Sequence, residues 1–67
     1  MENTGFQCVN GALFVGDMVE WHSGFQGVFE VVKRDDGYWL VDRSPFEDER
    51  FRDIKLDKDL DAHFTKR

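Results

Sequence analysis

The sequence predicts a mostly β protein that folds as a single small antiparallel β-barrel. Three observations lead to this fold class. The chain has 67 residues, which is enough for one domain and no more. Apolar and polar residues alternate over several short runs, as they do in half-buried strands. Ten aromatic residues, seven of them Phe, can fill a dense core, because each buries about 150–250 Å².

The first part of the chain is divided by its pattern into an arm and the start of the barrel. Residues 1–11 are expected to form an N-terminal arm or a short edge strand, because few apolar residues stand among polar ones and glycine. The barrel domain is assigned to residues 12–57. Residues 18–22 alternate as a strand does, and residues 22–27 hold two glycines three positions apart, which predicts a turn.

A hairpin in the middle of the chain is the clearest local signal. Residues 28–33 and 38–43 are rich in β-branched and aromatic residues, as strands are. Between them lies Asp36-Gly37, a dipeptide favoured in two-residue hairpin loops. The sequence therefore predicts two paired strands with the turn at these two residues.

The predicted register of this hairpin places complementary side chains opposite each other. A loop at residues 36 and 37 pairs Arg34 with Trp39 and Glu30 with Arg43, a cation over an indole ring and an ion pair. The other face of the hairpin is expected to carry Phe29, Val31 and Leu40. Because both faces are partly apolar, we expect the sheet to curl into a closed barrel.

The end of the chain is expected to form a helical turn, a strand, and a short helix or tail. Ser44 is followed by proline and, at the third position after it, by glutamate, which is the pattern of a helix start with a capping box. Residues 50–56 favour a strand. Residues 58–67 are predicted to form a short helix that buries Leu60 and Phe64, or a loose tail.

The charges of the chain are unevenly distributed. The net charge is −5, and no basic residue precedes Lys33, so the first 32 residues carry four acids alone. Two interpretations fit this distribution. The acids can belong to an ordinary solvated surface, or they can form an acidic region that repels phosphate and attracts a basic partner.

Several classes of protein are not expected from the sequence. The longest apolar run, residues 12–15, is far shorter than the roughly 20 residues of a membrane-spanning helix. Residues 1–11 have neither the basic start nor the apolar stretch of a signal peptide, so we expect a cytoplasmic location and no membrane association. The single cysteine, Cys8, rules out an internal disulfide and is expected to be a buried thiol.

No metal site is predicted. Asp57, Asp59 and Asp61 have the spacing with which a calcium loop begins, but Ala62 stands where that loop needs glycine. The two histidines and one cysteine provide no zinc pattern either. The three aspartates are therefore interpreted as a solvated acidic face.

No catalytic machinery is predicted, and no cofactor is expected. Asp17, His22 and Ser23 include the residue types of a catalytic triad, but no nucleophile elbow or other positioning motif accompanies them. The two glycines at residues 24 and 27 precede a strand, whereas phosphate-binding glycines open a helix. The chain is therefore expected not to be an enzyme.

A group of glycines and apolar residues resembles a known set of small barrels. Its members are Gly16-Asp17 and Val19, then Gly27-Val28 and Val31, then Gly37, Trp39, Leu40 and Val41. They resemble SH3-like barrels with a KOW-like turn pattern and, most closely, YopX-type proteins of phages and prophages, over residues 13–42. The resemblance implies a five-stranded, strongly bent barrel in a phage or prophage setting, with little assigned molecular function.

The leading hypothesis for function is a non-enzymatic protein-interaction module that binds a protein partner near residues 22–27. Phe25 lies in the predicted glycine turn, where an aromatic side chain is more often exposed than on a strand, and exposed aromatics commonly anchor interfaces. The candidate binding residues are Trp21, His22, Phe25, Tyr38 and Trp39. Core packing is the alternative role of these aromatics. The chain is expected to be a monomer or a weak homo-oligomer.

Two alternatives remain open at the level of sequence. The acidic balance also suits a nucleic-acid mimic that inhibits a host nucleic-acid-binding or defence complex. A weak basic stripe of Arg50, Arg52 and Lys55 is the basis for a KOW-like domain that binds RNA or DNA weakly, although acids interrupt it. Nucleic acid is therefore an unlikely partner.

Overall fold

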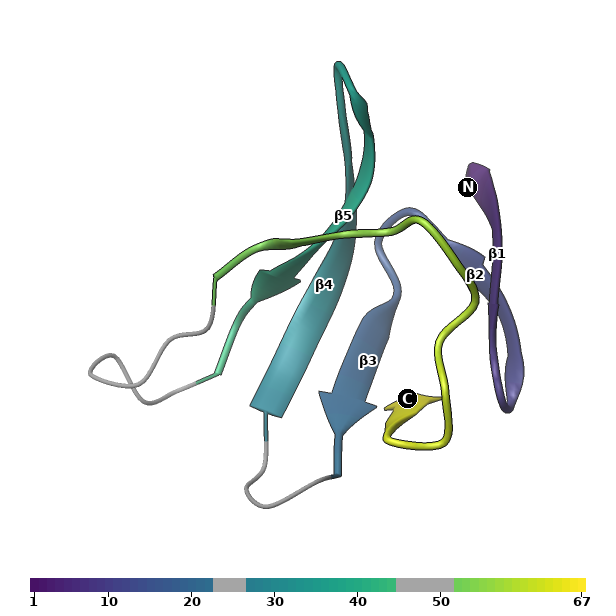
Figure 1. Cartoon of the computed structure of the whole chain (residues 1–67), viewed down its shortest axis with the longest axis vertical. Helices are drawn as coiled ribbons and strands as arrows, with labels where there is room; N and C mark the ends of the chain where they lie inside the picture. Colours follow the sequence, from purple (N-terminus) through teal and green to yellow (C-terminus); the bar gives the residue numbers. More distant parts are fainter. Residues whose placement is uncertain (23–26, 45–51) are drawn as a thin grey trace.

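The computed structural model describes residues 1–22, 27–44 and 52–67 (Figure 1). This part of the chain contains seven strands in two antiparallel sheets, so the expectation of a mostly β protein is confirmed. The first two strands pair with each other, and the other five form a sheet in the order β6-β5-β4-β3-β7. The strands are β1 (Asn3–Cys8), β2 (Gly11–Phe14), β3 (Met18–Trp21), β4 (Gly27–Arg34), β5 (Gly37–Asp42), β6 (Ile54–Lys55) and β7 (Phe64–Lys66).

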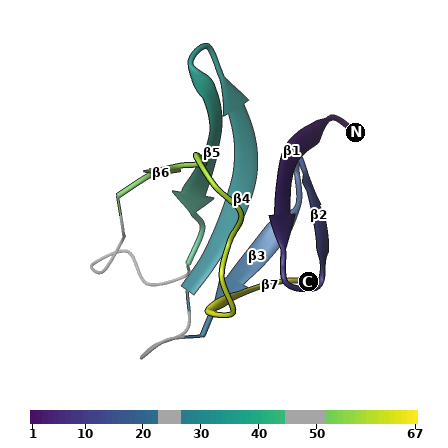
Figure 2. The same cartoon turned by 45° about the vertical axis from the view of Figure 1, so that its right-hand side comes forward.

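The described strands do not form the closed barrel expected from the sequence. β6 and β7 are the two edges of the five-stranded sheet, and no pairing joins them within the described residues. Residues 56–63 connect the two edges and cross in front of β5 and β4 (Figure 1, Figure 2). With two residues in β6 and three in β7, the edge strands are too short to complete a ladder across this seam.

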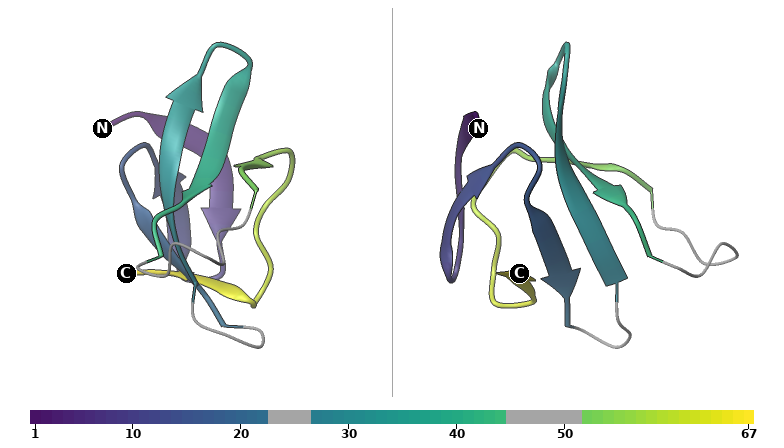
Figure 3. Two further views of the ribbon diagram at one scale, coloured as in Figure 1. Left: turned by 90° about the vertical axis from the view of Figure 1, so that its left-hand side faces the viewer. Right: turned by 180° about the vertical axis from the view of Figure 1, so that it is seen from behind.

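The hairpin of β1 and β2 packs beside β3 and β7 (Figure 3). Thr4 and Cys8 on β1 are buried, so this strand contributes to the interior. The Thr4 hydroxyl donates a hydrogen bond to the Leu13 carbonyl oxygen at 2.9 Å, and the Cys8 thiol donates to the Phe64 carbonyl oxygen at 3.1 Å. The division of the chain at residues 11 and 57 stays a prediction.

The predicted β4–β5 hairpin is present, but its register differs from the prediction by two residues. Arg34 pairs with Gly37 instead of Trp39, so the turn lies at Asp35-Asp36. A two-residue turn at Asp36-Gly37 needs positive φ at both residues, and only Gly37 has it, with φ of +133°. The Asp36 carboxylate also accepts a hydrogen bond from the Trp39 indole nitrogen at 2.9 Å, which fixes the turn.

A shift of two residues keeps each side chain on its predicted face. The Arg34 guanidinium lies 5.1 Å from the centre of the Trp39 ring, and Arg43 Nε lies 3.0 Å from Glu30 Oε1. Both pairs are diagonal neighbours in the observed register, a separation that long side chains can span. The predicted core face is confirmed, since Phe29, Val31 and Leu40 are buried.

The core lies between the β1–β2 hairpin, the five-stranded sheet and the segment that follows β6. Every strand except β6 contributes a residue to it. Burying each such side chain stabilises the fold by about 1.5–3 kcal/mol. Its members are Cys8, Leu13, Val19, Phe29, Val31, Leu40, Leu56 and Phe64.

The helix or tail predicted for residues 58–67 is wrong, because residues Phe64–Lys66 form a strand. β7 pairs antiparallel with β3, and Phe64 lies opposite Trp21. A tight turn precedes β7, in which the Phe64 amide donates to the Asp61 carbonyl oxygen at 3.2 Å. This turn reverses the chain, so Phe64 is buried from a strand instead of from a helix.

Two further expectations concern the segment after β5. Within residues 52–56 the predicted strand is present only as β6, and residues 50 and 51 lie outside the described residues. The helical turn predicted after Ser44 also lies outside them. Across the described part of the chain, no helix has the length and apolar character needed to cross a bilayer.

Lys66 on β7 links the C-terminal strand to the N-terminal hairpin. Its Nζ donates to the Ala12 carbonyl oxygen at 2.7 Å and lies 3.3 Å from Asp17 Oδ2. It also lies 5.4 Å from the centre of the Phe14 ring. The side chains of Lys66 and Asp17 are only 21% and 17% exposed, so water screens this pair less than it screens surface pairs.

Replacing Lys66 with methionine should lower the free energy of unfolding by about 2 kcal/mol, because it removes a hydrogen bond and leaves a shielded carboxylate without its cation. Urea denaturation followed by circular dichroism measures the change. Lys55→Met is the matched control, since Lys55 forms only an exposed pair at 3.8 Å with Asp36 and should cost less than about 0.5 kcal/mol. Equal losses in the two variants would contradict the linking role.

Candidate functional site

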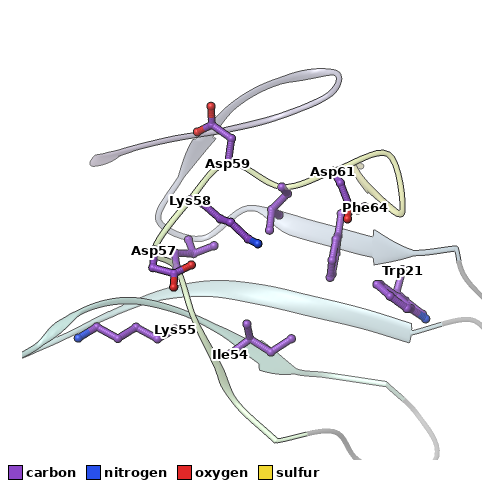
Figure 4. A pocket seen from close by; sticks show the side chains of 10 residues that line it. Trp21, Ile54, Lys55, Asp57, Lys58, Asp59, Asp61 and Phe64 are labelled. Carbon is purple, nitrogen blue, oxygen red and sulfur yellow. The ribbon is translucent and has the colours of Figure 1, made fainter.

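A groove lies at the open seam of the five-stranded sheet, between its edge strands β6 and β7 (Figure 4). Its volume is about 410 Å³, large enough to accept several side chains of a partner. β3, β6, β7 and the segment between β6 and β7 all contribute to its wall. The lining residues are Trp21, Ile54, Lys55, Leu56, Asp57, Lys58, Asp59, Leu60, Asp61 and Phe64.

The floor of the groove is aromatic because β3 and β7 place two rings opposite each other. Trp21 and Phe64 are cross-strand partners, and their ring centres lie 4.8 Å apart in an edge-to-face arrangement. The centre of the Phe29 ring lies 6.0 Å from that of Phe64. Edge-to-face pairs of this kind add about 0.5–1.5 kcal/mol beyond the area they bury, so these contacts stabilise the floor.

A smaller apolar pocket of about 70 Å³ opens beside this floor. It is lined by Trp21, Phe29, Ile54 and Phe64, and it shares three of these residues with the groove. Ile54 is 39% exposed, although large aliphatic side chains are usually buried. The seam thus leaves apolar surface accessible that a closed sheet would have covered.

The three predicted acidic residues, Asp57, Asp59 and Asp61, lie around this groove, and all are exposed. The Asp59 side chain points away from the cavity (Figure 4), where its Oδ1 accepts a hydrogen bond from the Gln7 amide at 2.9 Å. The Asp61 Oδ1 accepts from the His63 amide at 2.9 Å, and this hydrogen bond is the main reason that the pKa of Asp61 lies below its usual value. Asp57 and Asp61 therefore supply most of the negative charge at the mouth.

Two lysines also line the groove, and they point in different directions. Lys55 points away from the cavity, toward Asp36 on the β4–β5 turn, with 3.8 Å between Nζ and Oδ2. The Lys58 side chain points into the cavity (Figure 4), and its charge also contributes to the lowered pKa of Asp61. The groove mouth therefore already holds one ammonium group near carboxylates.

The structure brings only one of the predicted aromatic binding residues, Trp21, to this groove. His22 is exposed at the end of β3, where its Nε2 shares a hydrogen bond of 2.6 Å with the Thr65 hydroxyl. Trp39 lies on the outer face of the hairpin with Arg34 and Asp36, and Phe25 lies outside the described residues.

Tyr38, another predicted binding residue, does not reach the groove. Its hydroxyl donates a hydrogen bond to the Glu2 carboxylate. This hydrogen bond raises the pKa of Tyr38 and lowers that of Glu2, and Lys33 adds an ion pair to Glu2 at 3.1 Å. Tyr38 also packs against the core. The tyrosine therefore holds the N-terminus in place and is separate from the groove.

Sequence reasoning did not assign four apolar residues to the groove, namely Ile54, Leu56, Leu60 and Phe64. The alternation of residues 54–57 predicted a strand, but nothing in it revealed that the strand would be an exposed edge. The cross-strand contact between Trp21 and Phe64 spans 43 positions and depends on the docking of β7. No local pattern predicts a contact of this range.

The acidic first half of the sequence does not form a free acidic patch. Each of its four acids lies within 3.3 Å of a cation from residues 33–67. The pairs are Glu2 with Lys33, Asp17 with Lys66, Glu20 with Arg67, and Glu30 with Arg43. The charge asymmetry along the sequence is thus compensated in space.

No group of three or more His, Cys, Asp or Glu side chains among residues 1–22, 27–44 and 52–67 is placed to hold a metal ion. Comparisons with protein-family models, curated proteins and solved structures found no match. The fold and the groove define the chain as a small open-sheet β protein with an apolar surface groove.

The hydrogen bond to Asp61 predicts how stability depends on pH. A carboxyl with a lowered pKa stabilises the fold above its unfolded-state pKa, and this contribution disappears as the pH falls through the folded-state value. The stability difference between the wild type and Asp61→Ala should therefore be larger at about pH 6 than at about pH 2.5. Urea denaturation at the two pH values tests this. A difference that stays constant, or grows at low pH, would show that the carboxylate does not fix the turn.

Proposed function

We propose that this chain is a non-enzymatic protein-interaction module whose five-stranded sheet is an open SH3-like barrel. The strand order supports the fold assignment. β3, β4, β5 and β6 are neighbours in chain order, and the last strand, β7, returns to pair with β3. This up-and-down order with a returning last strand would give a five-stranded barrel if the seam between β6 and β7 were closed.

The proposal includes the resemblance to YopX-type proteins with a KOW-like turn pattern. The resembling residues, 13–42, extend from the end of β2 to the end of β5, so they include the strands that form the centre of the sheet. The phage or prophage setting and the cytoplasmic location rest on that resemblance and on the sequence.

The apolar groove is the observation that carries the proposed interaction. Its floor consists of Trp21 and Phe64, and the exposed Ile54 forms its edge. Aromatic side chains at the centre of an interface contribute most of the binding energy when a partner excludes water from them. The leading hypothesis therefore moves from residues 22–27 to the seam between β6 and β7.

The lining of the groove favours binding over catalysis. Its titratable groups are aspartates and lysines, and all five are exposed to solvent. No Ser, Cys or His side chain belongs to the described lining. Nucleophilic catalysis needs a nucleophile next to a positioned base, whereas a rigid apolar floor with a charged rim suits recognition.

The two alternatives have less support. A nucleic-acid mimic needs free carboxylates along one face, but the four acids of residues 1–32 are paired with cations. Weak nucleic-acid binding was based on Arg50, Arg52 and Lys55. Arg50 lies outside the described residues, and Lys55 is paired with Asp36.

The variant Ile54→Trp should weaken binding of a partner protein at least tenfold, because the larger ring fills the apolar pocket without changing the charge. Candidate partners are captured with the wild-type protein, and each is then purified and titrated against both proteins by calorimetry. Only binding of a purified partner counts as evidence.

Val9→Trp is the matched control, because Val9 is 59% exposed and lies outside the groove lining. It should change the affinity by less than about twofold. A purified partner that binds wild type and Ile54→Trp equally well, or the failure of every purified candidate to bind, would contradict the proposed function.

A further inference from the structure

We infer that the occupant of the groove is a basic segment of another protein with one aliphatic residue at its centre. The inference rests on the proposed function and specifies its partner. The aliphatic side chain would enter the pocket of Trp21, Phe29, Ile54 and Phe64. Flanking Lys or Arg side chains would lie beside Asp57 and Asp61.

The size and lining of the pocket indicate which side chain of the partner can enter it. The pocket measures about 70 Å³, and its walls are apolar side chains. A cavity of about 150 Å³ holds a benzene molecule. A pocket of half that volume matches a side chain of a few carbon atoms, such as Val or Leu.

The charge of the flanking residues follows from the groove mouth. Asp59 points away to the Gln7 amide and Lys55 points outward to Asp36, which leaves Asp57 and Asp61 against Lys58. The remaining lysine, Lys58, points into the cavity (Figure 4), and its charge makes a small contribution to the lowered pKa of Asp61. The chain's own lysine thus occupies the position that we assign to a partner's lysine or arginine.

The net charge argues against a second copy of this chain as the occupant. Each copy carries −5, so two copies repel at ordinary salt concentrations. A basic segment is attracted by the same charge, and the attraction increases its rate of association. Nucleic acid would be repelled in the same way as a second copy.

The test uses three synthetic nine-residue peptides. The first has Lys and Arg around a central Leu, the second has the same basic residues around a central Ser, and the third has Glu and Asp around a central Leu. The protein is the Trp39→Phe variant of the full chain, which leaves Trp21 as its only tryptophan. Because Trp21 forms the groove floor, its fluorescence then reports binding there.

The first peptide should bind most tightly, and its affinity should fall as salt is added. Loss of the Leu side chain should weaken binding by roughly tenfold or more, since burial of a leucine is the main apolar contribution. The acidic peptide should bind more weakly than the basic one. If all three peptides leave Trp21 fluorescence unchanged at millimolar concentration, or if the acidic peptide binds best, the inference is wrong.

Two charge variants made in the Trp39→Phe background give opposite expected results. Asp57→Asn should weaken binding of the basic Leu peptide by about two- to fivefold, because it removes one partner charge. Lys58→Ser should strengthen binding by a similar factor, because it removes the competing internal cation. If Lys58→Ser weakens binding, Lys58 contacts an acidic ligand and the inference is overturned.

The two proposals fail in distinguishable ways. A purified partner whose binding is lost in Ile54→Trp, but whose binding segment is acidic or uncharged, overturns the inference and leaves the interaction function intact. Binding of the basic peptide that Ile54→Trp does not change, measured by calorimetry, places the peptide outside the groove and overturns the inference, whereas the proposed function fails when a purified partner binds wild type and Ile54→Trp equally well.

Discussion

The packing of Phe64 against Trp21 and Phe29 is the contact on which the rest of this small structure depends. The phenylalanine ring closes the core from the C-terminal strand and, on its other side, forms the floor of the groove. The Phe64 carbonyl oxygen accepts a hydrogen bond from the Cys8 thiol, so the same residue also holds the N-terminal hairpin against the sheet. In a domain of this size few apolar contacts are available, and one residue that serves the core, the hairpin and the groove has a large effect on stability.

Electrostatics supports the same arrangement. Acids dominate the first half of the chain, and their cations come only from residues 33–67. The fold brings the two halves together, so that these acids form ion pairs with the cations. Lys66 pairs with Asp17, and Arg67 pairs with Glu20. Most of these pairs are exposed, so each contributes less than about 1 kcal/mol, but together they favour the topology in which the C-terminus returns to β3. The charged residues of the groove do not belong to these ion pairs. Asp57 lies at the groove mouth, and Lys58 points into the cavity.

Local sequence patterns predicted the central hairpin and its buried face, because alternation and turn chemistry act over a few residues. The register was predicted wrongly by two positions, since Asp36 does not adopt the positive φ that a turn at residues 36 and 37 needs, and the turn lies at Asp35-Asp36. The closed barrel and the C-terminal helix were wrong for a different reason, because both depend on how the short edge strands dock, which is a long-range effect. For the candidate site, the sequence identified Trp21 and the three aspartates separately. Their meeting at one groove required the return of β7, which no local pattern encodes.

The most direct test of this account is the free energy of unfolding of the Phe64→Ala variant, measured by urea denaturation against the wild type. The account predicts a protein that is unfolded or destabilised by about 3 kcal/mol or more, because the substitution opens a cavity between β3, β7 and the core. A variant that remains within about 1 kcal/mol of the wild type would contradict the claim that the Phe64 ring holds together the core and the floor of the groove.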